Sequence, residues 1–290
     1  MQRISETDLI LNADGSIYHL NLLPEDIADA VITVGDPDRV GEVSKHFDTI
    51  ELKKGKREFI THTGSLGGKR ITVLSTGIGT DNIDIVFNEL DALVNIDFKT
   101  RLVNDKLRSL NIIRIGTSGG IQADIPVDEL LVSASAFGLD ALMHYYHQEL
   151  NNEEQQLLSA FEKALPAGYK LNPYFAPAGK NLLQSLAHDL PQGITITAPG
   201  FYAPQGRQVR AKSLTPSLMD SIQQFGHNGQ RITNLEMETA GIYGLANSLG
   251  HQALSFNVIL ANRANHVFST DPSGVMDKFI GQILQRIVKM

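Results

Sequence analysis

The sequence lacks several features, and each absence removes a class of function. None of its 290 residues is cysteine, which excludes disulfides, thiolate catalysis, iron–sulfur clusters and cysteine-ligated zinc. No apolar run approaches the roughly 18 residues that a membrane-spanning helix requires. No signal peptide is visible at the N-terminus, which lacks a charged segment followed by an apolar one. We therefore expect a cytoplasmic enzyme that has no membrane partner.

Basic residues are not in excess either. The 25 Lys and Arg residues are outnumbered by 32 Asp and Glu residues, so the formal net charge is −7 at pH 7. A nucleic-acid-binding protein needs a dominant basic surface, so we expect no nucleic-acid partner. The nine histidines are scattered and form no HExxH motif, and His144 and His147 lack a further ligand nearby. We predict no metal site.

The pattern of apolar residues predicts an α/β fold. Short runs typical of buried strands alternate with helices of 3.6-residue period, which points to a central sheet covered by helices. The predicted strands are residues 30–34, 70–76, 111–115, 129–135, 193–197 and 253–260. The predicted helices are 80–94 (capped by Thr80 or Asp81), 153–165, 179–189, 217–225, 236–249 and 277–288. Composition is that of a globular chain and no linker interrupts it, so we expect one domain over residues 1–290.

One segment does not fit this alternation. Residues 95–108 are rich in charge and lie between a predicted helix and a predicted buried strand. The segment either extends the helix or forms an excursion on the surface, and the sequence leaves both alternatives open.

Several predicted strands end in glycine-rich or polar turns. These turns have the sequences GDPDR (35–39), STGIGT (75–80) and RIGTSGG (114–120). In an open α/β sheet, ligands bind beyond the carboxyl ends of the strands, so we expect the three turns to surround one pocket. Gly35 and Arg39 suit an anion, since glycine permits close approach of backbone N–H groups and arginine matches phosphate oxygens. A tight turn with a surface arginine would have the same sequence.

Arg114 lies within a predicted strand of isoleucines. Strand alternation places its side chain opposite Ile113 and Ile115. A buried guanidinium needs an anionic partner, because an unpaired buried charge is costly. That partner is either a carboxylate or a bound anion, and Thr117 adds a hydroxyl just beyond the strand.

Two further segments combine residue types that suit a small polar ligand. Glu236 and Glu238 begin a predicted helix, where they either complement the helix dipole or bind a diol. Phe201, Gln205 and Arg207 combine a stacking ring, an amide and a cation, a set that suits a pyrimidine base. A surface loop would look similar.

Taken together and in order, the motifs of the chain resemble those of the nucleoside phosphorylase superfamily, and within it the uridine phosphorylases. The motifs are YHLNL (18–22), VGDPDRV (34–40), KREF (56–59), STGIG (75–79), IRIGTSGGIQADIPV (113–127), FYAPQGR (201–207), NLEMET (234–239) and LANR (260–263). The resemblance implies a three-layer α/β/α domain with a central mixed sheet. It also implies reversible phosphorolysis of uridine to uracil and ribose 1-phosphate, with phosphate as co-substrate and no cofactor.

The resemblance further implies the residues of the site. The phosphate ligands would be Gly35, Arg39, Arg114 and Thr117, together with Arg57 from a neighbouring copy of the chain. The nucleoside ligands would be Ser118, Gly119, Phe201, Gln205, Arg207, Glu236, Met237 and Glu238, together with His19 from the neighbour at the 5′-hydroxyl. Arg114, Arg207 and Glu238 would carry the catalysis. Contributions from a neighbour imply at least a homodimer, with a hexamer as the larger alternative.

The sequence departs from the family pattern in three places. Purine phosphorylases and nucleosidases typically have an aspartate near the segment that here is Leu260–Arg263, and this chain has none there. This difference favours uridine, while a purine phosphorylase, a nucleosidase and a non-catalytic nucleoside-binding protein remain as alternatives. Asn82 replaces a serine expected near Glu58 at a monovalent-cation site, so potassium binding is left open. Residues 95–108 resemble an insertion.

Overall fold

A single mixed sheet of twelve strands runs through the computed structural model, which describes residues 3–290. Ten of its strands follow one another in the spatial order β11-β12-β10-β8-β13-β7-β1-β4-β3-β2, while β14 pairs with β13 and β9 pairs with β8. The strands are β1 (Ala30–Val34), β2 (Thr49–Lys56), β3 (Phe59–Leu66), β4 (Lys69–Ser75), β7 (Asn111–Gly120), β8 (Leu130–Gly138), β9 (Tyr174–Pro177), β10 (Gln192–Thr197), β11 (Gly226–His227), β12 (Gln230–Glu236), β13 (Gln252–Asn262) and β14 (Val267–Phe268).

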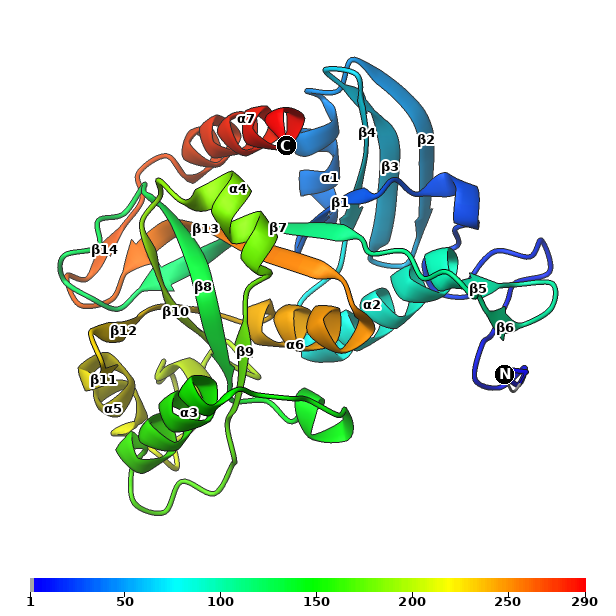
Figure 1. Ribbon diagram of the computed structural model, residues 1–290. Helices are drawn as coiled ribbons and strands as arrows, with labels where there is room; N and C mark the ends of the chain where they lie inside the picture. Colours follow the sequence, from blue (N-terminus) through cyan, green and yellow to red (C-terminus); the bar gives the residue numbers. More distant parts are fainter. Residues whose placement is uncertain (1–2) are drawn as a thin grey trace.

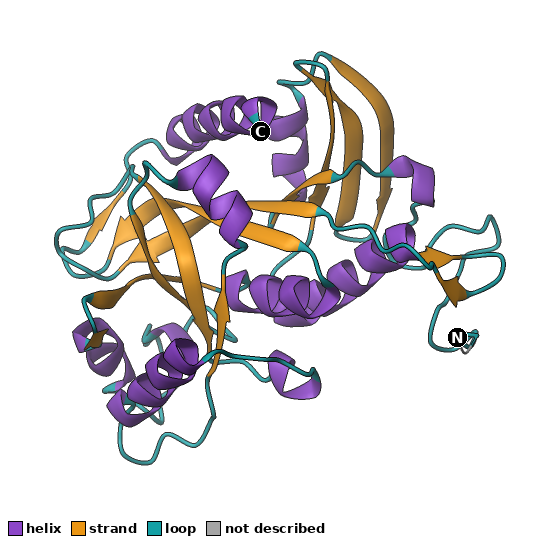
Figure 2. Ribbon diagram, in the orientation of Figure 1, coloured by secondary structure: helices purple, strands orange, loops and turns teal. Residues whose placement is uncertain are grey.

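Helices cover both faces of this sheet (Figures 1 and 2). The α-helices of residues 3–290 are α1 (Pro37–Ser44), α2 (Thr80–Asn95), α3 (Asn152–Ala164), α4 (Lys180–Ala187), α5 (Leu218–Gln224), α6 (Thr239–Leu249) and α7 (Pro272–Lys289). In Figure 1, α1 and α7 lie on one side of β7 and β13, while α2 and α6 lie side by side on the other. The predicted α/β architecture with a mixed central sheet is confirmed. Within residues 3–290, every helix is too short or too polar to cross a membrane.

The parallel strands β4, β1, β7 and β13 form the centre of the sheet. Ile32 of β1 pairs with Val73 and Ile113, and Ile113 pairs with Leu254 on the far side of β7. All five side chains of β1 are buried, as expected of a strand covered on both faces. Parallel strands end at one edge of the sheet, so the turns after β1 and β4 are brought together beside the second half of β7. The predicted turn at residues 114–120 is wrong, because β7 runs on to Gly120 in pairing with β13 and β12.

One end of the sheet closes on itself. β12 pairs with β10 in parallel, and it also pairs with the end of β7, where Leu235 lies opposite Gly119. Strands β7, β13, β8, β10 and β12 therefore form a closed ring. This closure removes the free edge that β12 would otherwise expose, and it places Glu236 close to the end of β7.

The structure corrects the predicted starts of two helices. α2 is capped by Gly79, which has a φ of 98°, and neither Thr80 nor Asp81 is the cap. The helix predicted from residue 236 begins at Thr239, because Glu236 still pairs with Thr197 as the last residue of β12. Strands β2 and β3 were not predicted.

The charged segment 95–108 forms an excursion and does not extend the helix. α2 ends at Asn95, and a small hairpin follows, made of β5 (Ile96–Asp97) and β6 (Leu102–Val103). Figure 1 shows this hairpin beside the N-terminal segment. The Arg101 guanidinium donates to the backbone oxygens of Ile4 and Ser5, at 3.2 and 3.1 Å. The hairpin therefore holds the N-terminal segment in place.

Candidate active site

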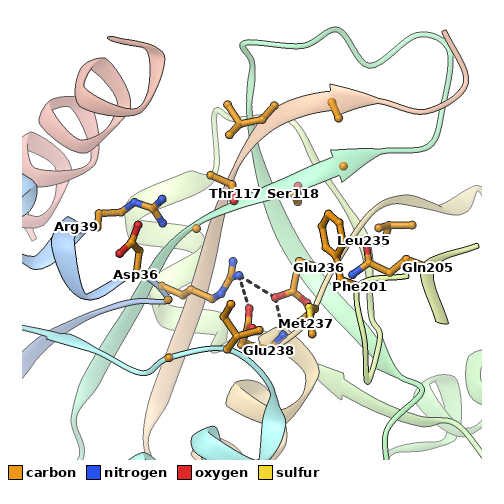
Figure 3. Close-up of a pocket in the computed structure, with 18 of the residues that line it drawn as sticks. Asp36, Arg39, Thr117, Ser118, Phe201, Gln205, Leu235, Glu236, Met237 and Glu238 are labelled. Carbon is orange, nitrogen blue, oxygen red and sulfur yellow. Dashed lines mark hydrogen bonds and ion pairs between the residues drawn. The ribbon is translucent and has the colours of Figure 1, made fainter. Parts of the chain in front are cut away.

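A cavity of about 670 Å³ lies where the carboxyl ends of the central strands meet. Its walls come from the turns after β1 and β4, from the second half of β7, from the end of β12, and from the loop that follows β10 (Figure 3). Most of the predicted site residues line it, namely Gly35, Arg39, Arg114, Thr117, Ser118, Gly119, Phe201, Gln205, Arg207, Glu236, Met237 and Glu238. Residues from distant parts of the sequence thus meet in one place, as predicted.

Arg114 occupies the centre of this arrangement, with its guanidinium between two carboxylates. Its Nη2 lies 2.7 Å from Glu238 Oε2 and 3.0 Å from Glu236 Oε2 (dashed lines in Figure 3). Burial disfavours the charged guanidinium, but the two carboxylates outweigh it and raise the pKa of Arg114. The sequence left open whether Arg114 pairs with a carboxylate or with a bound anion, and the structure shows two carboxylates beside it.

Gly116 makes room for this guanidinium. A Cβ at Gly116 would lie 2.1 Å from Nη1 and 2.4 Å from Cζ of Arg114. No real side chain fits at such distances, so the Arg114 side chain can fold back along its own strand only because residue 116 is glycine.

Glu236 is already saturated with hydrogen bonds. It accepts from the Thr197 hydroxyl at 2.6 Å, from Glu238 N at 2.8 Å and from Thr239 N at 2.9 Å, besides pairing with Arg114. These bonds hold the start of α6 against the end of β10. Glu236 therefore fixes the neighbouring groups, and its direct contact with a nucleoside stays a prediction.

Glu238 keeps acceptor capacity that faces the cavity. Its Oε1 accepts from Gly79 N at 2.9 Å, and its Oε2 accepts from Arg114. Burial raises the pKa of this carboxyl, and the nearby Arg114 charge opposes that rise. A carboxylate with two oxygens and unused lone pairs can accept from two adjacent hydroxyls, which is the chemistry that a ribose diol requires.

Arg39 marks a second end of the cavity. Its side chain is largely buried, its nearest carboxylate oxygen is 3.9 Å away on Glu42, and its buried Nε has no hydrogen-bond partner among residues 3–290. Burial lowers the pKa of Arg39; the carboxylates of Glu42 and Asp36 oppose this fall, and the positive charge of Arg114 adds to it. Two cations facing one space, with one donor unsatisfied, form a site suited to an anion.

Phe201, Gln205 and Arg207 form the opposite end. The Arg207 guanidinium lies 3.7 Å from the centroid of the Phe201 ring, and its Nη1 donates to Phe201 O at 2.8 Å and to Gln205 Oε1. Burial lowers the pKa of Arg207, and the charge of Arg263 adds to this effect. The amide of Gln205 and the cation of Arg207 together offer donors and an acceptor to the edge of a planar ring.

Sequence reasoning missed Arg263, which was considered only as part of a segment without aspartate. Its Nη1 donates to Gln205 O, its backbone N donates to Gly120 O at 2.8 Å, and burial lowers the pKa of its guanidinium. The adjacent Asn262 has no free amide: Nδ2 donates to Gln122 O and Ile125 O, and Oδ1 accepts from Asn265 N. Arg263 could have been located from its position shortly after a predicted strand, since residues at the carboxyl ends of such strands line the pocket.

His19 and Arg57 do not line the cavity. Nδ1 of His19 lies 2.6 Å from Glu89 Oε1, and Glu89 also accepts from His19 N at 3.0 Å and Leu20 N at 2.8 Å. Arg57 is exposed in the turn between β2 and β3. The role of both residues at the site of another copy stays a prediction. Glu58 and Asn82, for which the sequence left potassium binding open, both line the cavity.

Comparisons with known proteins agree with this geometry. The sequence profile of the phosphorylase superfamily matches residues 29–288. The uridine phosphorylase of Thermococcus kodakarensis is 31% identical over 258 residues, which cover 88% of this chain and 80% of the relative. A DeoD-type purine nucleoside phosphorylase of Bacillus thuringiensis is 25% identical, with 87% of each chain covered.

A solved structure is similar over almost the whole chain. It is a nucleoside phosphorylase of Trypanosoma brucei described as showing uridine phosphorylase activity. The TM-score is 0.88 at 29% identity, and the alignment covers 98% of this chain and 100% of the other.

Proposed function

The chain belongs to the phosphorylase superfamily, and from this premise we propose that it catalyses the reversible phosphorolysis of uridine to uracil and ribose 1-phosphate. The observation that carries the proposal is the order of groups along one cavity. An incompletely paired arginine lies at one end, a buried carboxylate in the middle, and an amide with a cation at the other. These groups match a phosphate, a ribose diol and a pyrimidine edge in the order in which the reaction brings them together.

The reaction requires charge stabilisation at both ends of the breaking bond. Cleavage of a glycosidic bond passes through an oxocarbenium-like state. Arg39, Arg114 and Thr117 hold the phosphate beneath C1′, while Glu238 fixes the ribose hydroxyls. The base leaves with a growing negative charge, which Arg207 and Gln205 stabilise. Donors aimed at charge that develops only in the transition state raise the rate itself.

The base end of the cavity favours a pyrimidine over a purine. A purine-specific site would place a hydrogen-bonding side chain at N7, near the segment that ends β13. Here the amide nitrogen of Asn262 is committed to backbone oxygens of the loop after β7, while Gln205 and Arg207 present the polar groups. The purine phosphorylases among the relatives make a purine nucleoside the alternative substrate to be tested.

The complete site requires a second copy of the chain. His19 and Arg57 lie outside their own cavity, and in the proposed homodimer they reach the 5′-hydroxyl and the phosphate of the neighbouring site. A hexamer built from such dimers would keep the same arrangement. The cytoplasmic location expected from the sequence remains a prediction, and no step of the proposed reaction uses a metal cation.

Phosphorus NMR tests the proposed chemistry directly. Incubation of the protein with uridine and inorganic phosphate should convert the phosphate signal into that of ribose 1-phosphate. Addition of uracil and ribose 1-phosphate should regenerate uridine. An unchanged phosphate signal with release of uracil, followed by ultraviolet absorbance, would identify a nucleosidase. Tight uridine binding in calorimetry with no product would identify a binding protein.

A further inference from the structure

A line of polar side chains fills the interior of the closed ring of strands. Asn257, Ser133, Thr195 and Asn234 are all fully buried, and they come from β13, β8, β10 and β12 in that order. Burial of amides and hydroxyls is costly unless every one of them is hydrogen-bonded, and even then apolar groups of the same shape can stabilise a core as well or better. Four such residues in a row therefore call for an explanation other than stability.

These residues connect two groups of the active site. Arg114 Nη1 lies 3.2 Å from Asn257 Oδ1, and Asn257 Nδ2 lies 2.8 Å from Ser133 Oγ. Ser133 Oγ lies 2.5 Å from Thr195 Oγ1, which in turn lies 2.8 Å from Asn234 Oδ1. The line ends where Asn234 Nδ2 lies 3.0 Å from the hydroxyl of Ser118. Both ends, Arg114 and Ser118, belong to β7 and line the cavity.

The direction of every hydrogen bond follows from the arginine, which can only donate. Asn257 must therefore present its oxygen to Arg114 and its NH₂ to Ser133. Ser133 accepts that bond, so its single proton goes to Thr195. By the same reasoning the proton of Thr195 goes to Asn234.

The last step concerns Ser118. Asn234 uses its oxygen as acceptor and donates its NH₂ to Ser118 Oγ. The Ser118 proton is left without a partner among residues 3–290, and the hydroxyl lies at the cavity wall.

We propose that Asn257, Ser133, Thr195 and Asn234 are positioning residues, which turn the Ser118 hydroxyl so that it donates to an oxygen of the bound nucleoside. The inference rests on the proposed function, since it concerns the same cavity. A hydroxyl in solution divides its time between donating and accepting. The line of hydrogen bonds fixes the Ser118 hydroxyl before the substrate arrives, so less orientational freedom is lost on binding. Hydrogen bonds in such a line also polarise one another.

Two threonines provide a matched pair of variants. Thr195 and Thr233 are both buried, and both donate to Asn234 Oδ1, at 2.8 and 3.0 Å. Of the two, Thr195 alone also contacts Ser133, so it alone belongs to the line of hydrogen bonds between Arg114 and Ser118. Replacement by valine removes the hydroxyl and keeps the shape of the side chain.

The experiment measures kcat/KM for uridine at saturating phosphate. We expect Thr195→Val to lower it about 5–10-fold, in the range of one lost hydrogen bond, and Thr233→Val to leave it within about twofold. KM for phosphate should be unchanged in both. Thr195→Ser retains the hydroxyl and should restore near-wild-type activity.

A double-mutant cycle distinguishes an effect of Thr195 that acts through Ser118, which we call the relay, from a general loss of structure. If Thr195 acts through Ser118, Thr195→Val should have almost no effect in a Ser118→Ala background. Effects that multiply in the double variant would overturn the proposal, as would equal losses in Thr195→Val and Thr233→Val. If Thr195→Val does not fold, Thr195→Ala enters the same cycle.

Calorimetric binding of uridine makes the test independent of turnover. Absence of uridine cleavage by the wild-type protein would refute the proposed function, and the same cycle would then be measured in Kd. Coupling between residues 195 and 118 in Kd would support the relay without catalysis. Additive effects on Kd would overturn it.

Discussion

At the scale of single residues, the arginines of the cavity differ in how their charge is balanced. Arg114 is paired with two carboxylates, so this cluster already carries its own counter-charge. Arg39 has only the Glu42 carboxylate, 3.9 Å from its Nε, and Arg207 pairs with no carboxylate among residues 3–290, while burial lowers the pKa of both. The two least neutralised arginines of the cavity therefore lie at opposite ends of it, where the proposed reaction requires the phosphate and the departing base.

Removal of the Arg207 guanidinium should slow the chemical step. Arg207→Ala removes a donor that faces the developing charge of the uracil, and loss of such a donor costs about 3–4 kcal/mol, or roughly 10²–10³-fold in kcat. Arg210→Ala is the matched control, since Arg210 is exposed in the same loop and does not line the cavity. Steady-state kinetics with uridine measures both. Near-normal kcat in Arg207→Ala would refute the assignment of the base site.

The raised pKa of Glu238 has a consequence for the pH profile. Burial favours the neutral acid, so this carboxyl gains a proton at a higher pH than an ordinary glutamate. The ionised form pairs with Arg114 and accepts from the ribose hydroxyls, so kcat/KM for uridine should fall as pH decreases through this raised value. In Glu238→Gln the acid limb due to this group should be absent, and activity at neutral pH should be about 10-fold or more lower. Phosphate titrates equally in both proteins, so an identical acid limb in the two would exclude Glu238 as its source.

At the scale of elements, the sequence predicts best where burial decides the structure. The isoleucines and valines of β1, β4 and β7 read as strands because both of their faces are covered. The hairpin of β2 and β3 was missed, because β2 is an edge strand with the sequence TIELKKGK and its exposed residues follow no clear apolar alternation. β7 continues through its glycines because β13 and β12 pair with it there, and pairing between distant strands is not visible in a local pattern.

The same contrast holds for the site. Arg39, Gln205 and Arg207 could be located from their motifs, because residue type and a place after a strand were informative. The saturation of Glu236, the position of Arg263 and the commitment of Asn262 depend on contacts between loops that are far apart in the sequence. The start of α6 was misplaced for the same reason, since pairing with β10 keeps Glu236 in a strand.

Strand β7 supplies the element-scale test. Gly116→Ala would place a Cβ within 2.1–2.7 Å of the Arg114 guanidinium, so the side chain would have to leave its pair of carboxylates. We expect a loss of at least about 100-fold in kcat/KM for uridine, by analogy with other displaced charge-stabilising groups. Gly41→Ala in α1 meets nothing within 4 Å and should raise the free energy of unfolding by about 0.5–1 kcal/mol without changing kcat/KM. Wild-type kinetics in Gly116→Ala would contradict the described geometry of Arg114.

At the scale of the whole molecule, the cavity and the surface around it belong to one functional unit. The closed ring of strands holds within a single chain the residues to which the proposed function assigns the base and the ribose. His19 and Arg57 lie outside that cavity, and Glu89 holds the His19–Leu20 segment through hydrogen bonds from the His19 ring and from the backbone N–H groups of both residues. The proposed homodimer follows from this separation, because each copy carries groups that its own cavity does not use.

Subunit mixing tests the shared site. Arg57→Ala and Glu238→Gln should each lose most of their activity as homodimers. In a mixed dimer, one site carries both changes and the other carries neither. Random reassociation of equal amounts should therefore restore about a quarter of wild-type activity. Activity that stays at the mean of the two variants would show that Arg57 serves the cavity of its own chain or none.

The central claim is that phosphate cleaves a pyrimidine nucleoside in this cavity. The most direct measurement is ultraviolet detection of uracil release from uridine, with and without inorganic phosphate, beside an inosine control. We predict release from uridine only in the presence of phosphate, and none of comparable rate from inosine. Release without phosphate, or cleavage of inosine alone, would contradict the account.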